Sequence, residues 1–150
     1  MGTVTDARGD LTARIDTIEA SYEFFLAFAA QGTPADAAGG HGQQVRAYLQ
    51  RFDDAVAGLA DVIRAAGAAL PDGQAAALRG FADVVERDGG AAQAAVRLVN
   101  AQPGVGSQLV DNFNASIHVR ALLTDLFLVD EVLGPDKGSA IADSQPQGGD

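Results

Sequence analysis

Apolar side chains that recur at every third and fourth position constrain this 150-residue chain more than any other feature. Such spacing places the apolar groups on one face of an α-helix. No segment alternates apolar and polar residues for long enough to form a β-strand. We therefore expect an all-α fold. The helical pattern occupies four segments, at about 11–31, 43–66, 78–99 and 107–133.

Four such segments with short connections predict an antiparallel four-helix bundle. Gly89 and Gly90 lie in the middle of the third segment, where glycine lowers the propensity for helix. A five-helix bundle, with a break at these glycines, is the alternative. Thr33 and Pro34 are typical of a helix start and predict a short helix before Gly39.

The composition changes after Gly134 to Asp, Gly, Ser, Gln and Pro. A segment of this kind has too little large apolar surface to pack against the rest of the chain. We expect residues 1–134 to form one helical-bundle domain. Residues 135–150 are predicted to be a flexible, acidic and polar tail.

The residue types that are absent exclude several classes of protein. The chain has no cysteine, which removes thiolate metal sites, disulfides and thiol catalysis. Its formal net charge is −10, so it lacks the excess of Lys and Arg that proteins use to bind nucleic-acid phosphates. No apolar run is long enough for a membrane span, and the first ten residues lack the pattern of a secretory signal. We expect a cytoplasmic protein that binds no nucleic acid.

Helical bundles often hold metal ions, and a carboxylate-bridged di-iron site needs Glu-x-x-His pairs. Alanine stands three positions before both His41 and His118. The chain also lacks a phosphate-binding loop and the residue order of a Ser-His-Asp triad. We expect no metal, no cofactor and no catalytic activity.

His118 is the one candidate for chemistry. Helical spacing predicts that it shares a polar face with Asp111, Asn114 and Asp125. An accessible imidazole with Arg120 nearby is the minimal chemistry of a phosphoacceptor. Histidine phosphotransfer modules are four-helix bundles of similar length, but their usual His-x-x-Lys-Gly pattern is absent here. A surface or packing histidine is the main interpretation, and phosphotransfer is the alternative.

Two stretches, Tyr22–Phe28 and Leu122–Val129, carry more apolar residues than one buried helix face requires. We interpret this excess as a contact surface for a second copy of the chain or for another protein. The alternative is a pocket for an apolar ligand such as a tetrapyrrole or lipid, with Tyr22 and Tyr48 as polar handles. The candidate contact residues are Tyr22, Phe24, Phe25, Phe28, Leu123, Phe127 and Leu128. The sequence thus predicts a non-catalytic interaction or accessory protein that forms a homodimer through its first and last helices.

Overall fold

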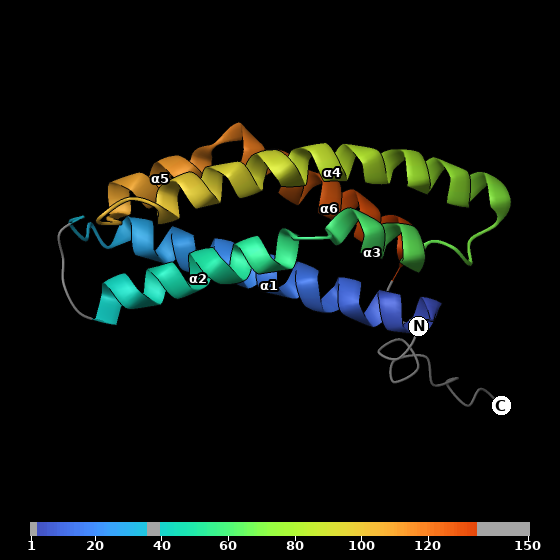
Figure 1. Cartoon of the computed structure of the whole chain (residues 1–150), viewed down its shortest axis with the longest axis horizontal. Helices are drawn as coiled ribbons and strands as arrows, with labels where there is room; N and C mark the ends of the chain where they lie inside the picture. The colour runs from blue at the N-terminus through green and yellow to red at the C-terminus, as the bar shows by residue number, and fades with distance from the viewer. Residues whose placement is uncertain (1–2, 36–39, 135–150) are drawn as a thin grey trace, which may run out of the picture.

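The computed structural model describes residues 3–35 and 40–134, and every regular element in these ranges is an α-helix. The all-α prediction is confirmed. Figure 1 shows the helices α1 (Val4–Ala30), α2 (Gly40–Val56), α3 (Leu59–Ala66), α4 (Asp72–Asn100), α5 (Ser107–Ala115) and α6 (Ile117–Leu133). The predicted tail and most of the predicted short helix after Pro34 lie outside the described residues.

The helices form four columns of alternating direction (Figure 1). The first column is α1, the second is α2 followed by α3, the third is α4, and the fourth is α5 followed by α6. Helix α1 packs against α2, α3 and α5, while α4 packs against α2, α3, α5 and α6. The four predicted segments therefore correspond to four antiparallel columns. None of the described helices is long and apolar enough to cross a lipid bilayer.

The second column breaks at Gly58, which adopts a left-handed backbone with φ of 74°. Side chains with a Cβ rarely adopt this conformation, and glycine does so without strain. The break frees backbone carbonyl groups, and Arg14 on α1 donates hydrogen bonds to the carbonyls of Ala55 and Ala57. A side chain from the neighbouring column thus provides hydrogen-bond donors for the carbonyl groups that the helix break leaves without backbone partners.

The third column does not break. Helix α4 continues through Gly89 and Gly90, so the alternative of a break at these glycines is wrong and the third segment is one helix. Gly89 is buried, and a Cβ placed there would lie 3.1 Å from Cγ1 of Val56. The glycine lets the end of α2 approach α4 closely, and tertiary packing outweighs its low helix propensity.

The fourth column breaks at Ser116, where the backbone is extended. The Ser116 hydroxyl accepts a hydrogen bond from the amide of Val119, which makes it the N-cap of α6. The break separates α5 from α6 and changes the rotation of the second half of the column. Residues spaced regularly across it therefore do not share one face.

The centre of the bundle contains three phenylalanine rings from three columns. Phe25 on α1, Phe52 on α2 and Phe113 on α5 are buried and pack edge to face, with centroids 5.6 to 6.2 Å apart. This geometry is favourable for aromatic pairs. The rings fill the core by contact with one another.

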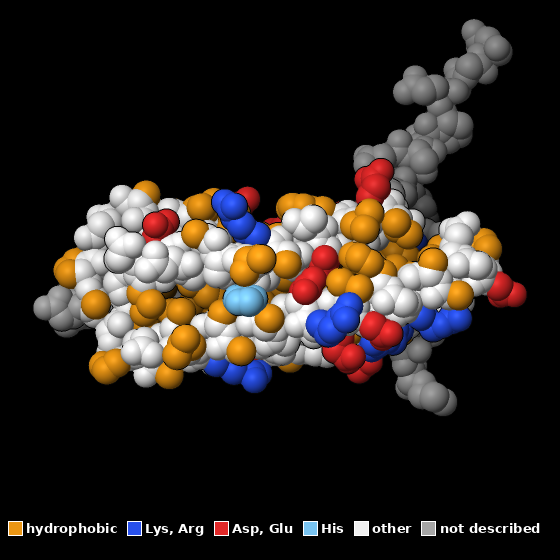
Figure 2. Space-filling model, turned by 90° about the horizontal axis from the view of Figure 1, so that it is seen from above, with side chains coloured by type: hydrophobic (Ala, Val, Ile, Leu, Met, Phe, Trp, Pro, Cys, Tyr) orange, Lys and Arg blue, Asp and Glu red, His pale blue; other side chains and the backbone are white. Residues whose placement is uncertain are grey.

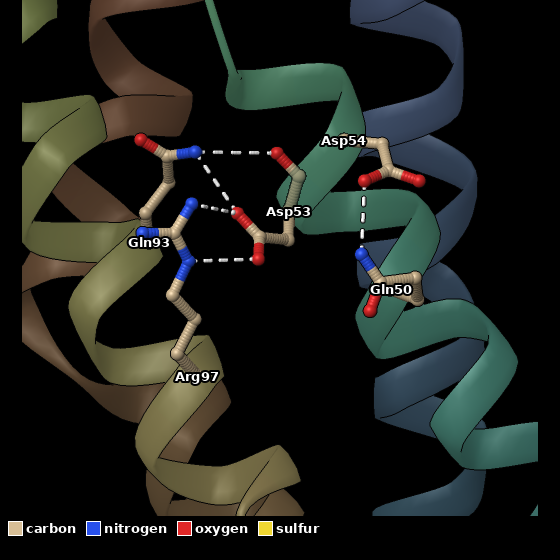
Figure 3. A network of polar contacts seen from close by, with 5 residues as sticks. All are labelled: Gln50, Asp53, Asp54, Gln93 and Arg97. Atoms are coloured by element: carbon tan, nitrogen blue, oxygen red, sulfur yellow. Dashed lines mark hydrogen bonds and ion pairs between the residues drawn. The ribbon is translucent and has the colours of Figure 1, made fainter.

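A polar network connects α2 to α4 beside this core (Figure 3). Arg97 donates from Nε and Nη2 to the two carboxylate oxygens of Asp53, at 2.9 and 3.0 Å, and Gln93 donates to the same carboxylate at 2.9 Å. Partial burial raises the pKa of Asp53, but the hydrogen bonds from Arg97 and Gln93 outweigh burial and lower it from its ordinary value. The network fixes the register of the two helices.

Candidate functional site

Helix α6 exposes four large apolar side chains, of which Ile117 lies at its N-terminal end and the other three lie in its last two turns. Phe127 is 59% exposed, Leu128 is 51% exposed and Val132 is 50% exposed. We call these three residues the α6 surface. Figure 2, which views the molecule from the side of α4 and α5, shows hydrophobic side chains gathered in groups among charged ones. Helix α6 carries apolar residues on nearly all of its sides, but only one side packs against α4 and α5. The apolar residues on the other sides therefore remain exposed.

A groove of about 530 Å³ runs between α1 and α6. We call it the α1–α6 groove, and its lining consists of Glu19, Tyr22, Glu23, Arg120, Leu123, Thr124 and Phe127. Beyond the groove, at the N-terminal end of α1, Arg8 ties the two helices together. Its Nη2 donates to the carbonyl oxygens of Leu133 and Gly134, each at 2.8 Å.

Acidic groups dominate the electrostatics of the α1–α6 groove. Partial burial raises the pKa of the Glu19 carboxyl, and repulsion from Asp16, Asp130 and Glu23 raises it further. These carboxylates come from both walls, since Asp130 belongs to α6 and the others to α1. A positive charge on a bound partner would relieve this repulsion.

A second groove, of about 270 Å³, lies between α4 and α6. We call it the α4–α6 groove, and it is lined by Gln74, Ala77, Leu78, Phe81, Leu128, Val129 and Val132. None of these side chains is charged. The two edges of α6 therefore differ, with an acidic groove toward α1 and an uncharged groove toward α4.

The predicted contact residues of α1 are divided between the core and the surface. Phe25 and Phe28 are buried, and Leu123 on α6 is buried beneath the α1–α6 groove. Phe24 stacks on Tyr48 of α2, with ring centroids 4.0 Å apart and planes inclined by 8°. The sequence does not predict this contact of Phe24 with Tyr48, because helical periodicity does not show which side of α1 the second column will occupy.

The ring of Tyr48 is itself covered by the Arg51 guanidinium, 4.7 Å from the ring centroid. Tyr22 is half-buried in the α1–α6 groove. The two tyrosines that the sequence suggested as polar handles of one ligand pocket thus take part in different contacts. Among the predicted contact residues, Phe127 and Leu128 on α6 are the exposed ones, and on α1 the neighbouring Leu26 is 50% exposed.

His118 is exposed, as a phosphoacceptor must be, but its predicted polar face is not formed. Asn114 is buried on α5, before the break at Ser116, and Asp125 is buried on α6 beside Asp88 of α4. Arg120 lines the α1–α6 groove, and residues two positions apart on a helix do not face each other. The structure brings no second functional group to His118 among the residues that the sequence suggested.

Two buried polar side chains were not predicted. Burial and the nearby Asp88 raise the pKa of Asp125 to about 7. In the described part of the chain, one carboxylate oxygen of Asp125 and both amide atoms of Asn114 lack a hydrogen-bond partner. Helical spacing places both residues on the polar face predicted for His118, so burial was not expected at either position.

No group of three or more His, Asp or Glu side chains within residues 3–35 and 40–134 is arranged to hold a metal ion. The chain matches no protein-family model, no curated protein and no solved structure.

Proposed function

We propose that this protein is a non-catalytic interaction protein that binds other proteins through the α6 surface. The observation that carries the proposal is the half-exposure of Phe127, Leu128 and Val132 in the last two turns of one helix. Contiguous apolar surface of this kind is typical of protein contact sites. The cytoplasm remains the compartment that the cysteine-free sequence predicts.

The first partner that we propose is a second copy of the chain, bound through the α4–α6 groove. Two copies that each carry a net charge of −10 repel each other, so a contact between them must avoid facing carboxylates. The lining of the α4–α6 groove is uncharged, and Leu128 and Val132 protrude beside Phe81. A contact that joins these residues to their copies removes apolar area from water without opposing like charges.

The expected affinity follows from the area available. Fully burying one such side chain is worth about 1.5–3 kcal/mol, so covering the half-exposed Leu128 and Val132 together with the partly buried Phe81 contributes about 3 kcal/mol per copy. Both copies together contribute about 6 kcal/mol, to which the rest of the groove lining adds. The loss of translational and rotational freedom on association offsets part of this sum, so we expect a weak dimer with a dissociation constant of about 100 μM.

Sedimentation equilibrium at concentrations of about 1 to 100 μM tests the proposal. We expect the wild type to dimerise and Leu128→Glu to remain monomeric. The matched control is Leu98→Glu, because Leu98 is 67% exposed on α4 and lies about 25 Å along the helix from Phe81. A monomeric wild type, or equal loss of dimer in both variants, would contradict a contact at the α4–α6 groove.

The exposure of His118 keeps phosphotransfer as a second candidate function. An exposed imidazole can accept a phosphoryl group, whereas a buried one cannot. Incubation with acetyl phosphate, followed by mass spectrometry at neutral pH, tests it directly. A phosphoryl group that His118→Gln abolishes would support this function, and an unmodified wild type would exclude autonomous phosphorylation from acetyl phosphate.

A further inference from the structure

The α1–α6 groove has an apolar base and a rim of mixed polarity. Leu123 lies at the base, with Tyr22 on the α1 side and Phe127 exposed on α6. The lining residues of α6 extend from Arg120 to Phe127, about 10 Å along the helix axis. An amphipathic helix that presents apolar residues at i, i+4 and i+7 spans the same length. The shape of the groove thus matches a short helical ridge.

The charges around the groove select among such helices. Three carboxylates of α1, at Asp16, Glu19 and Glu23, and the carboxylate of Asp130 on α6 all act on the same region. Arg120 is the one cation in the groove lining that the structure describes, and it belongs to the N-terminal half of α6. The end of the groove near Asp16 and Asp130 is therefore strongly negative.

From this combination we propose that the α1–α6 groove binds a basic amphipathic helix of a partner protein, with its apolar ridge on Leu123 and Phe127 and its Lys or Arg side chains beside Glu19. The inference rests on the proposed protein-binding role of α6, but not on self-association, which uses the other edge of the helix. A cationic side chain beside Glu19 lowers the pKa of that carboxyl by relieving the repulsion that raises it.

Other occupants fit this groove less well. A second copy would bring its own Asp130 and Glu131 on α6 toward the carboxylates of α1, which is unfavourable for an acidic chain. An anionic membrane surface would be repelled in the same way. A cationic partner is the one whose charge complements both walls.

The test uses a synthetic helical peptide of about four turns, with Leu at i, i+4 and i+7 and Lys on its flanks, labelled with fluorescein. Its binding to the full chain is measured by fluorescence anisotropy. A second peptide, with Glu in place of every Lys, is the charge control. We expect the Lys peptide to bind and the Glu peptide to bind at least about tenfold more weakly.

Variants of the chain locate the site. Glu19→Gln with Glu23→Gln is expected to weaken binding of the Lys peptide by about fivefold, and Phe127→Ala by about tenfold. The matched control is Asp54→Asn with Asp61→Asn, which removes the same charge from exposed positions of α2 and α3 and is expected to change the affinity less than twofold, roughly. Circular dichroism confirms that each variant is folded.

Equal weakening by the two double variants would show that the peptide responds only to net charge and would overturn the proposal. Failure of the Lys peptide to bind, or equal binding of the Glu peptide, would also overturn it. Sedimentation of the same variants separates this inference from the proposed function. A wild type that binds the peptide but stays monomeric supports the groove and contradicts the homodimer, and a dimer that ignores the peptide does the reverse.

Discussion

Replacement of Asp125 by Asn is expected to stabilise the protein at pH 8, and by less than half as much at pH 5. Asp125 is buried on α6. Burial and the neighbouring Asp88 raise the pKa of its carboxyl to about 7 in the folded protein. The ordinary value, 3.8, applies to the unfolded chain. The folded state therefore keeps the proton at a pH where the unfolded state has lost it, and the stability that this proton provides falls as the pH rises from about 4 to about 7.

The size of the effect follows from the two pKa values. A rise of about three units in the pKa of Asp125 would correspond to about 4 kcal/mol if the carboxyl were fully shielded from water. Solvent at the shallow groove that Asp125 shares with Arg120 and Thr124 screens the charge, and we take about half of that limit, about 2 kcal/mol. Because Asn carries no charge, the variant should recover this energy above pH 7. In a domain of this size it corresponds to a rise in melting temperature of about 6 °C.

Thermal unfolding followed by circular dichroism from pH 5 to pH 8 measures the difference between the variant and the wild type. Asp111→Asn is the matched control, since Asp111 is exposed on α5 and should show no difference that varies with pH. A melting temperature at pH 8 that is equal to or below that of the wild type would refute the reasoning. It would mean that Asp125 carries its charge in the folded protein at no cost.

Four further variants test the packing. In urea unfolding, Phe25→Ala should lower the free energy of unfolding by about 3–5 kcal/mol, because it removes a fully buried ring. Phe127→Ala should lower it by less than about 1 kcal/mol, because that ring is exposed. Similar losses in the two variants would contradict the assignment of core and surface. Gly90→Ala should stabilise by about 0.5–1 kcal/mol, because α4 is continuous there and no atom lies within 4 Å of the added Cβ; destabilisation would point to a break in the helix. Gly58→Ala should destabilise by about 1 kcal/mol, because φ at this residue is 74°; a neutral result in the same urea titration would argue against the left-handed turn.

The sequence predicts the columns of this fold better than the breaks within them. The spacing of Leu11, Ile15 and Ile18 correctly indicates the buried face of α1, because burial imposes the helical period directly. Glycine position does not decide where a column breaks. Gly58 ends a helix and Gly89 does not, and the difference lies in tertiary contacts, with Arg14 capping the first site and Val56 packing on the second.

The candidate site could be predicted only in part, for the same reason. The apolar excess of α6 is visible in the sequence and corresponds to exposed Phe127 and Leu128. On α1, Phe24 is covered by Tyr48 and Phe25 by the aromatic core, while Leu26 stays 50% exposed, and no local pattern reveals this division. The polar face that was predicted around His118 is lost for two reasons. Ser116 interrupts the register between Asn114 and His118, and packing against α4 buries Asp125 on α6 itself.

The measurement that tests the central proposal most directly is methyl NMR of the full chain as its concentration is raised. If the α6 surface binds a second copy through the α4–α6 groove, the methyl signals of Leu128 and Val132 should shift with concentration, while those of Leu98, equally apolar and 67% exposed, stay fixed. Signals of Leu128 and Val132 that do not move while the protein dimerises, or shifts centred on Leu98, would contradict the α6 surface as the site of contact.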